Sequence, residues 1–198
     1  MKKTKLITSI ASIVTVAAPL AATSCSLDKA KTSNDLSSNV TKVIGTESKK
    51  LGGITAKVTF YEDETSKWCE ITKYEDCEDN KRLDVPATLT YKDESYPVTK
   101  IADEAFKDEG RSVYAVDFTY ASNLKEIGNR AFNKCSMDTD DFLVYHQLDL
   151  SKTQLERIGD EAFLDCIGSP AGWDKNLDKL ILPKTIKYLG DRAFGCYD

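Results

Sequence analysis

Leu155-Glu-Arg-Ile158-Gly-Asp160-Glu-Ala162-Phe163 is one of four copies of a nine-residue phrase in this chain. The other copies are Val98-Thr-Lys-Ile101-Ala-Asp103-Glu-Ala105-Phe106, Leu124-Lys-Glu-Ile127-Gly-Asn129-Arg-Ala131-Phe132 and Ile186-Lys-Tyr-Leu189-Gly-Asp191-Arg-Ala193-Phe194. Their final phenylalanines are spaced 26, 31 and 31 residues apart. A fixed period in this range is typical of a solenoid, in which each repeat buries its apolar face against its neighbours.

Each phrase predicts a sharp turn followed by a short helix. The glycine of the last three copies suits a turn with positive φ. The Asp or Asn that follows is a residue type that caps helices, because its side chain accepts hydrogen bonds from the first free N–H groups. Three strand-like stretches precede the last three phrases: Val116-Asp-Phe118, Leu148-Asp-Leu150 and Leu180-Ile-Leu182. We therefore expect strand, turn, short helix and return loop in each repeat, with a parallel ladder on one face.

The apolar positions of the phrases predict the core of the solenoid. A cysteine follows the phenylalanine by three residues in two copies and by two residues in the last. We interpret these cysteines as a buried ladder of small apolar side chains rather than as metal ligands or redox groups. The predicted core residues are Ile101, Phe106, Ile127, Phe132, Cys135, Ile158, Phe163, Cys166, Leu189, Phe194 and Cys196.

The pattern Leu-x-x-Ile-Gly-x-x-Ala-Phe-x-x-Cys resembles the BspA-type leucine-rich repeats of bacterial surface proteins. The resemblance covers residues 83–198. It departs from the pattern at Ala102, which replaces the glycine of the first copy, and in the missing or early cysteine of the first and last copies. The resemblance implies an α/β repeat solenoid on a surface protein that attaches to host matrix proteins or to other cells.

The N-terminus predicts export and a lipid anchor. Three lysines precede an uncharged apolar run from Leu6 to Leu20, which is the pattern of a secretion signal. The small residues directly before Cys25 resemble a bacterial lipobox, which would make Cys25 the lipidated first residue of the mature protein. Ordinary signal-peptide cleavage and an uncleaved anchor remain the alternatives. Lipidation predicts a protein anchored on the extracellular face of a bacterial membrane.

The charge of the chain argues against nucleic acid as a partner. Removal of residues 1–24 takes away three of the 27 basic residues and none of the 32 acidic ones, so the net charge falls from −5 to −8. Phosphate contacts need basic patches. The negative net charge also disfavours binding to anionic lipid through clustered basic residues.

Four segments are expected along the chain. Residues 1–24 form the signal peptide, residues 25–50 a flexible tether rich in Ser, Thr, Asn and Lys, residues 51–97 a β-rich cap and residues 98–198 the solenoid. Ile54 to Phe60 alternates with period two and predicts a half-buried strand. Further strands are expected around Trp68 to Tyr74, at Leu83 and Val85, and in a hairpin around Lys92. A solenoid needs its first edge covered, and this unit provides the cover.

Little in the sequence supports catalysis, a metal or a cofactor. The chain has a single histidine, His146, so a multi-histidine zinc site is excluded. A Cys135–His146 dyad and weak calcium binding at 138–141 are the alternatives to a structural ladder and a solvated acidic loop. Cys69 and Cys77 are placed on neighbouring strands, where they form either a disulfide or two free thiols.

Two long return loops carry the predicted binding residues, which are Phe142, Tyr145, His146 and Trp173. Both loops fall at the same point of the repeat, and repeat proteins often bind through insertions on one face. The alternative is that these aromatics fold back onto the helices. The first functional hypothesis is a lipid-anchored, adhesin-like module that binds a host or neighbouring-cell protein. The second is a structural protein that self-associates, or joins another surface protein, through its uncapped C-terminal repeat.

Overall fold

The computed structural model describes residues 40–78, 82–109, 112–113, 115–135, 147–166 and 179–195, which belong to one compact unit of residues 38–198. The described residues form strands and turns, and none of them is helical. The strands are β1 (Lys42–Leu51), β2 (Ile54–Glu62), β3 (Lys67–Cys77), β4 (Arg82–Asp84), β5 (Thr88–Tyr91), β6 (Glu94–Ile101), β7 (Ala115–Asp117), β8 (Glu126–Ile127), β9 (Gln147–Asp149), β10 (Arg157–Ile158), β11 (Lys179–Ile181) and β12 (Tyr188–Leu189).

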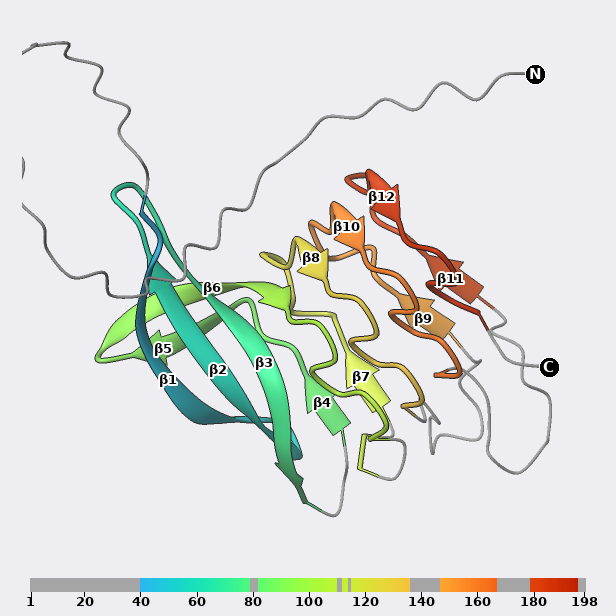
Figure 1. The fold of residues 1–198 in the computed structure, drawn as a ribbon, viewed down its shortest axis with the longest axis horizontal. Coiled ribbons are helices and arrows are strands. Elements are labelled where there is room, and N and C mark those ends of the chain that lie inside the picture. The colour runs from blue at the N-terminus through green and yellow to red at the C-terminus, as the bar shows by residue number, and fades with distance from the viewer. Residues whose placement is uncertain are drawn as a thin grey trace, which may run out of the picture. The chain divides into compact units, whose positions relative to one another are not determined.

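One sheet runs through the whole unit in the order β1-β2-β3-β6-β8-β10-β12, with β5 paired to β6 (Figure 1). The pairs β1–β2 and β2–β3 are antiparallel, whereas every pair from β3 to β12 is parallel. The alternation predicted for Ile54 to Phe60 is confirmed, because every second side chain of this part of β2 is buried. The antiparallel N-terminal strands and the parallel repeats therefore share a continuous sheet and one hydrophobic core.

A second row of short strands lies on the other side of the repeats (Figure 1). β4 pairs with β7, and β9 pairs with β11, all in parallel. The three strands predicted before the last three phrases are confirmed, each beginning one residue earlier than expected. β4 was expected in the N-terminal unit, but its partner is a repeat strand. The repeat architecture therefore begins at Arg82, before the expected boundary at residue 98.

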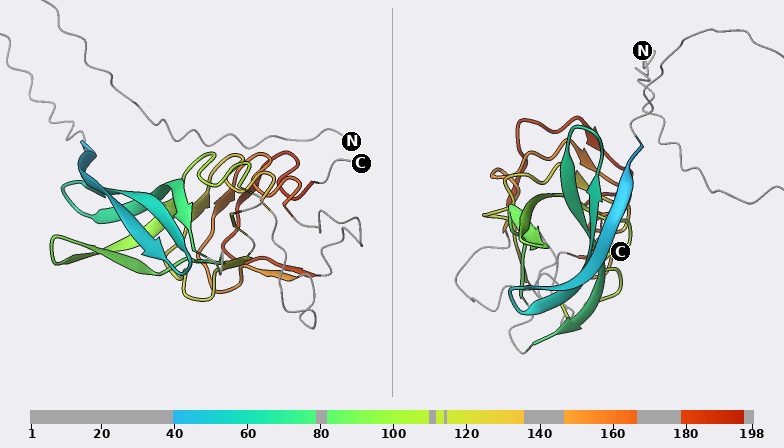
Figure 2. Two further views of the ribbon diagram at one scale, coloured as in Figure 1. Left: turned by 90° about the horizontal axis from the view of Figure 1, so that it is seen from below. Right: turned by 90° about the vertical axis from the view of Figure 1, so that its left-hand side faces the viewer.

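The predicted short helices are wrong: each phrase ends in a turn. The residue after the Asp or Asn has positive φ in all four copies, with 57° at Glu104, 53° at Arg130, 56° at Glu161 and 53° at Arg192. A right-handed helix needs negative φ, so it cannot start there. The free N–H groups bond to the next repeat instead, as from Phe132 N to the carbonyl oxygen of Ala162 at 2.8 Å. The turns form a stacked row along one side of the repeats (Figure 2).

The repeat glycines are required for close approach between repeats, not for positive φ. Gly52 is the only described glycine with positive φ. A Cβ added at Gly128 would lie 2.5 Å from the backbone nitrogen of Asp103, and one at Gly159 would lie 2.5 Å from that of Asn129. Ala102 is tolerated in the first copy because its neighbour is β3, to which it is linked by a 2.8 Å bond from its N–H to the Ile71 oxygen.

Stacked phenylalanines form the centre of the repeat core. Consecutive rings from Phe106 to Phe194 have centroids 5.2, 5.2 and 5.3 Å apart and are nearly parallel. The predicted core is confirmed at Ile101, Ile127, Ile158 and the first three phenylalanines, which have no exposed surface. Cys135 and Cys166 are buried as predicted, and Cys135 Sγ donates to the Phe106 oxygen at 2.8 Å. Leu189 is an exception at 47% exposure, Phe194 is half-buried, and Cys196 lies outside the described residues.

Two expectations for the N-terminal part need correction. Residues 42–50 are not tether, because they form most of β1 and pair with β2 along its whole length. Cys69 and Cys77 are free thiols on one strand, β3, rather than on two neighbouring strands. Eight residues of extended chain separate them by about 26 Å, whereas a disulfide needs Cα atoms within about 7 Å. No bridge between them is possible.

Candidate protein-binding surface

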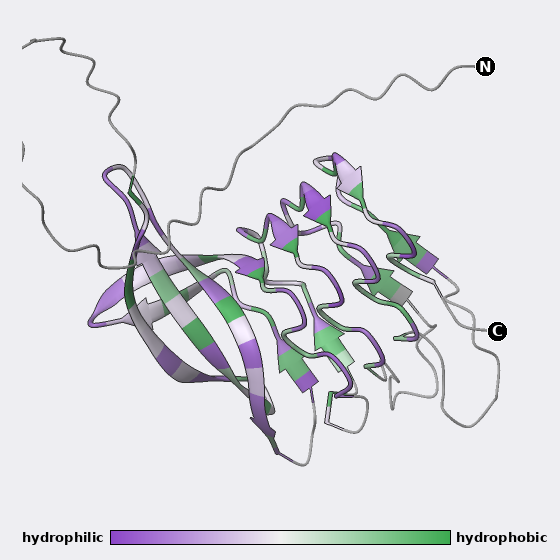
Figure 3. Cartoon of the chain, viewed as in Figure 1, coloured by the Kyte–Doolittle hydropathy of each residue, from purple (hydrophilic) through white to green (hydrophobic). Residues whose placement is uncertain are grey.

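The outward face of the main sheet presents one row of polar side chains across five strands. Its members are Glu70, Lys100, Glu126, Arg157 and Tyr188, from β3, β6, β8, β10 and β12, and we call it the charged row. Each member of the row from Lys100 onward directly precedes the inward-facing Ile or Leu of its phrase. Successive side chains of a strand alternate between faces, so the row points away from the core. Figure 3 shows the hydrophilic colouring of β8 and β10 on this side.

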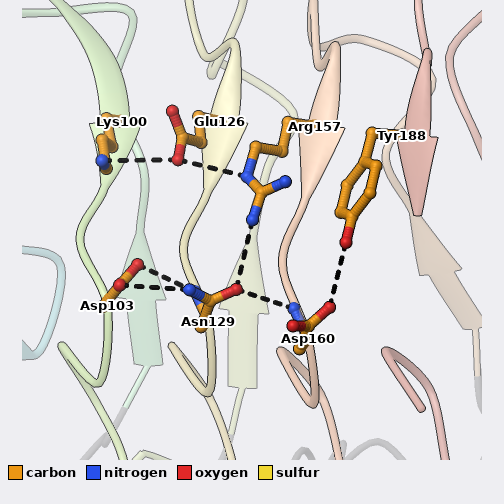
Figure 4. Close-up of polar contacts among 7 residues, drawn as sticks. All are labelled: Lys100, Asp103, Glu126, Asn129, Arg157, Asp160 and Tyr188. Atoms are coloured by element: carbon orange, nitrogen blue, oxygen red, sulfur yellow. Dashed lines mark hydrogen bonds and ion pairs between the residues drawn. The ribbon is translucent and has the colours of Figure 1, made fainter. Parts of the chain in front are cut away.

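The signs of the charged row alternate, and its members contact one another in sequence (Figure 4). Lys100 Nζ lies 3.3 Å from Glu126 Oε1, and that oxygen lies 3.5 Å from Arg157 Nε. The Arg157 guanidinium stacks 4.3 Å from the centroid of the Tyr188 ring. These contacts hold the side chains side by side, which lowers the entropy lost when a partner binds them.

A second ladder runs beside the charged row and corrects the predicted helix caps. The Asp or Asn of each of the first three phrases accepts from the backbone N–H of its equivalent in the next repeat, not from its own turn (Figure 4). The N–H donors are Asn129 to Asp103 at 2.9 Å, Asp160 to Asn129 at 2.9 Å and Asp191 to Asp160 at 3.0 Å. The side chains therefore join neighbouring repeats and fix the position of the charged row above them.

Glu70 forms the N-terminal end of the charged row. Burial raises the pKa of its carboxyl group, and the nearby Lys100 ammonium opposes that shift. A partner that brings another positive charge to this point would stabilise the carboxylate. Glu70 therefore has a nearby cation on one side, Lys100, whereas Glu126 has cations on both sides.

Aromatic side chains lie at both ends of the row. Tyr61 and Trp68 stack with ring centroids 5.6 Å apart on β2 and β3, next to Glu70. Tyr188, which is 43% exposed, lies at the opposite end. Tyr, Trp and Arg are the residues that most often dominate protein-binding interfaces. The face therefore combines rigid aromatic anchors with fixed charges, which suits recognition of a folded protein surface.

The sequence-predicted binding residues Phe142, Tyr145, His146 and Trp173 lie outside the described residues, as does the lipidation candidate Cys25.

The charged row was missed by sequence reasoning. The available signal was the position two residues before the glycine position, where the four copies carry Lys, Glu, Arg and Tyr and the next residue is always Ile or Leu. The apolar residue that follows marks this position as outward-facing, because successive side chains of a strand alternate between the two faces.

Metal and thiol chemistry find no site in the part of the chain that the structure describes. No group of three or more His, Cys, Asp or Glu there could hold a metal ion. Burial raises the pKa of the Cys69 thiol to about 12, so it is unreactive at neutral pH. His146 and residues 138–141, which carry the dyad and calcium hypotheses, lie outside the described residues. None of the described segments is a helix long and apolar enough to cross a membrane.

Comparison with solved structures found leucine-rich repeat proteins of bacteria. Similar solved structures include a leucine-rich repeat protein from Bacteroides capillosus ATCC 29799, with 21% identity, 68% of this chain and 97% of that chain covered, and a TM-score of 0.38. A leucine rich cell surface protein from Faecalibacterium prausnitzii A2-165 is 21% identical, with 75% of this chain and 46% of that chain covered and a TM-score of 0.32. The chain thus spans less than half of the second protein.

No match was found among the curated proteins. The sequence model of the BspA type leucine rich repeat region matches residues 88–196 in six copies, two more than the four nine-residue phrases. The match covers more than half of the chain and indicates no catalytic family. Together with the parallel ladder and the stacked phenylalanines, this match establishes that the chain belongs to the BspA-type leucine-rich repeat family.

Proposed function

We propose that this protein is a lipid-anchored, adhesin-like module of the bacterial cell surface that binds a host or neighbouring-cell protein. The charged row with its aromatic ends carries this proposal, because it places Trp68, Arg157 and Tyr188 on one outward sheet face. Leucine-rich repeat arrays generally bind proteins over such extended surfaces. Burial of the Cys69, Cys135 and Cys166 side chains disfavours nucleophilic chemistry at these thiols and is consistent with a binding role.

The location rests on the N-terminal sequence. Cys25 follows an apolar run and small residues, as the lipidated cysteine of a bacterial lipoprotein does. Residues 26–41 would then connect the anchor to the start of β1. Metabolic labelling with a fatty acid tests the anchor: label should enter the whole protein and be lost in Cys25→Ser. Loss of the folded domain after protease treatment of intact cells would place it on the outer face.

The binding proposal is tested by capture on a panel of purified host extracellular-matrix proteins. The probe is residues 38–198, the compact unit, because a fragment starting at residue 51 would lack β1. A face variant carries Trp68→Ala with Arg157→Ala, and a loop variant carries Tyr145→Ala with Trp173→Ala. Tyr120→Ala is the control, since Tyr120 is exposed and lies outside the charged row.

Capture that is lost only in the face variant supports the charged row as the binding surface. Capture that is lost only in the loop variant would instead place the binding site on the two long return loops, which carry Tyr145 and Trp173. Equal capture by all variants, or capture by no panel member, would contradict the adhesin-like proposal for this unit.

A structural or assembly role is the second candidate. It is favoured by the exposure of Leu189 on β12, since Ile101, Ile127 and Ile158 at the equivalent inward position have no exposed surface. In this role the protein self-associates or joins another surface protein through its C-terminal repeat. A mass that rises with concentration for residues 38–198 alone would support self-association.

A further inference from the structure

The charged row lies at one level of the main sheet and runs across its strands. The strand register places Glu70 beside Lys100, Lys100 beside Glu126, and Glu126 beside Arg157. Tyr188 follows as the register partner of Arg157. Neighbouring members are therefore separated by the spacing of hydrogen-bonded strands, about 4.8 Å. The backbone sets this spacing, so it is the same in every molecule of the protein.

The order of the charges makes the row complementary to a second copy of itself. Its charged part begins with an acid, Glu70, ends with a base, Arg157, and alternates in between. A two-fold axis normal to the sheet, between Lys100 and Glu126, would bring each charge opposite a charge of the other sign. Glu70 would face Arg157 of the other copy, and Lys100 would face Glu126 of the other copy. Because an isologous interface contains every contact twice, all charged members of both rows would be paired.

Other two-fold arrangements of the same face pair the charges less well. An axis through β8 would place Glu126 against Glu126, and Lys100 against Arg157. An axis between β8 and β10 would pair Glu126 with Arg157 but leave Glu70 beyond the end of the other row. Like charges across an interface suppress wrong alignments. The charge order therefore selects the axis between β6 and β8.

The aromatic ends of the row match under the same axis. Tyr188 leans toward the C-terminal ends of the parallel strands, where its hydroxyl donates to Asp160 Oδ1 at 3.1 Å. Trp68 lies on the opposite side of the row, because it precedes Glu70 by two residues on β3. Two-fold rotation reverses the strand direction, so it would bring Tyr188 of one copy to the stacked Tyr61 and Trp68 of the other.

Glu70 would gain most from this arrangement. Its nearby cation is Lys100, whereas its register partner on β2 is the uncharged Thr59. Arg157 of the other copy would bring a guanidinium group, which can form two parallel hydrogen bonds with a carboxylate. Glu126 already has cations on both sides. The contact between Glu70 and Arg157 is therefore the one that tests the arrangement best.

We propose that the charged row binds the charged row of a second copy of this chain, face to face about a two-fold axis between β6 and β8. The proposal rests on the charged row being the binding surface of the proposed function, and it names the partner. A different protein would have to carry the same spacing and the matching order of charges, whereas a second copy carries both. Exposed ion pairs make a weak contact, which display of many copies on one surface would multiply.

Charge reversals test the arrangement in residues 38–198 by sedimentation equilibrium at physiological ionic strength. The screening length there is about 8 Å, so contact pairs persist while the repulsion between two acidic molecules is largely screened. We expect dimers of the unaltered protein that increase with concentration. Arg157→Glu and Glu70→Lys should each raise the dimer dissociation constant about tenfold or more, because each places like charges across the interface. Lys184→Glu should leave it unchanged, since Lys184 is exposed and lies outside the row.

A mixture of the Arg157→Glu and Glu70→Lys variants should recover dimers that neither variant forms alone. In the mixed dimer an acid faces a base at every charged position, and loss of folding cannot produce such recovery. Thermal unfolding of each variant is measured alongside. If a reversal fails to fold, Lys100→Glu and Glu126→Lys test the same interface in the same way, because these two residues also face each other.

The outcomes separate this proposal from the proposed function. Monomers of the unaltered protein at all concentrations, dimers that Arg157→Glu leaves intact, or a mixture that stays monomeric would each overturn it. A protein that stays monomeric but captures a matrix protein through the charged row would overturn this inference and leave the proposed function standing. Dimers that depend on the charged row, without capture of any matrix protein, would support this inference against the adhesin-like proposal.

Discussion

Ile101 and Leu189 occupy the same position in the first and last phrases, yet the first has no exposed surface and the second is about half exposed. The first phrase contains the end of β6, which pairs with β3 on one side and with β8 on the other, whereas β12 pairs with β10 alone among the described strands. The difference shows that burial in this fold depends on the neighbouring repeat and not on the phrase itself. The same residue type should therefore contribute very different free energies in the middle and at the end of the array.

The largest effect is expected from the phenylalanine stack. Phe132→Ala should lower the free energy of unfolding by about 3–5 kcal/mol, because Phe132 is fully buried between two parallel rings. Phe194→Ala should cost only about 1–2 kcal/mol, because that ring is half-buried and stacks on one side. Urea unfolding of both variants measures the difference. Equal losses would mean that the terminal repeat is as well covered as the others.

Substitution of a repeat glycine should give the next largest effect. Gly159→Ala should destabilise by about 1–3 kcal/mol, because the added methyl group would meet the backbone of Asn129. The reverse change at the equivalent position of the first copy, Ala102→Gly, should cost only about 0.5–1 kcal/mol through chain entropy. Thermal unfolding of the two variants compares them. A larger loss for Ala102→Gly would contradict the close-approach explanation.

The ladder of Asp and Asn side chains should give a smaller difference. Asn129→Ala leaves the N–H of Asp160 without its acceptor and should cost about 1 kcal/mol. Asp191→Ala removes a carboxylate that accepts no bond from a described residue, so the change should stay within about 0.5 kcal/mol. Denaturant midpoints measured together decide this, and identical midpoints for the two variants would argue against the ladder as a stabilising element.

The smallest effect is expected at Glu70 and depends on pH. Burial raises the pKa of Glu70 in the folded state, so the ionised carboxylate lowers stability at neutral pH, and this cost disappears once the group is protonated in both states. Glu70→Gln should therefore stabilise the protein slightly at pH 7, and the gain should vanish as the pH falls below the ordinary pKa of a glutamate. Unfolding midpoints at pH 7 and pH 4 give the comparison; a gain independent of pH would assign the effect to packing.

Sequence reasoning identified the core because the apolar spacing around Ile127 and Phe132 is the same in every copy. It failed at the turns because Asn129-Arg-Ala-Phe satisfies the local rules for a capped helix equally well. Only the next repeat, which accepts the N–H of Phe132, distinguishes the two outcomes. The same holds for Gly128, whose neighbour in space is a backbone atom 25 residues earlier in the chain.

Two other features could not be predicted from the sequence, each for a different reason. β1 has few large apolar residues and resembles a tether, but its backbone completes the edge of β2. The charged row carries a different residue in each copy, so a search for constant positions passes over it. Both features depend on pairing between segments, which local composition does not record.

The charge of the residue that follows the Asp or Asn alternates between copies, from Glu104 to Arg130, Glu161 and Arg192. Arg130 pairs with Glu104, and Arg192 pairs with Glu161. This alternation has a consequence for how such an array can change in length during evolution. Gain or loss of one repeat would bring Arg130 against Arg192, or Glu104 against Glu161, at the new junction. Gain or loss of two adjacent repeats would keep the signs alternating along the array. Duplication in pairs is therefore the route that preserves these contacts, and repeat number in related arrays with this alternation should vary in steps of two.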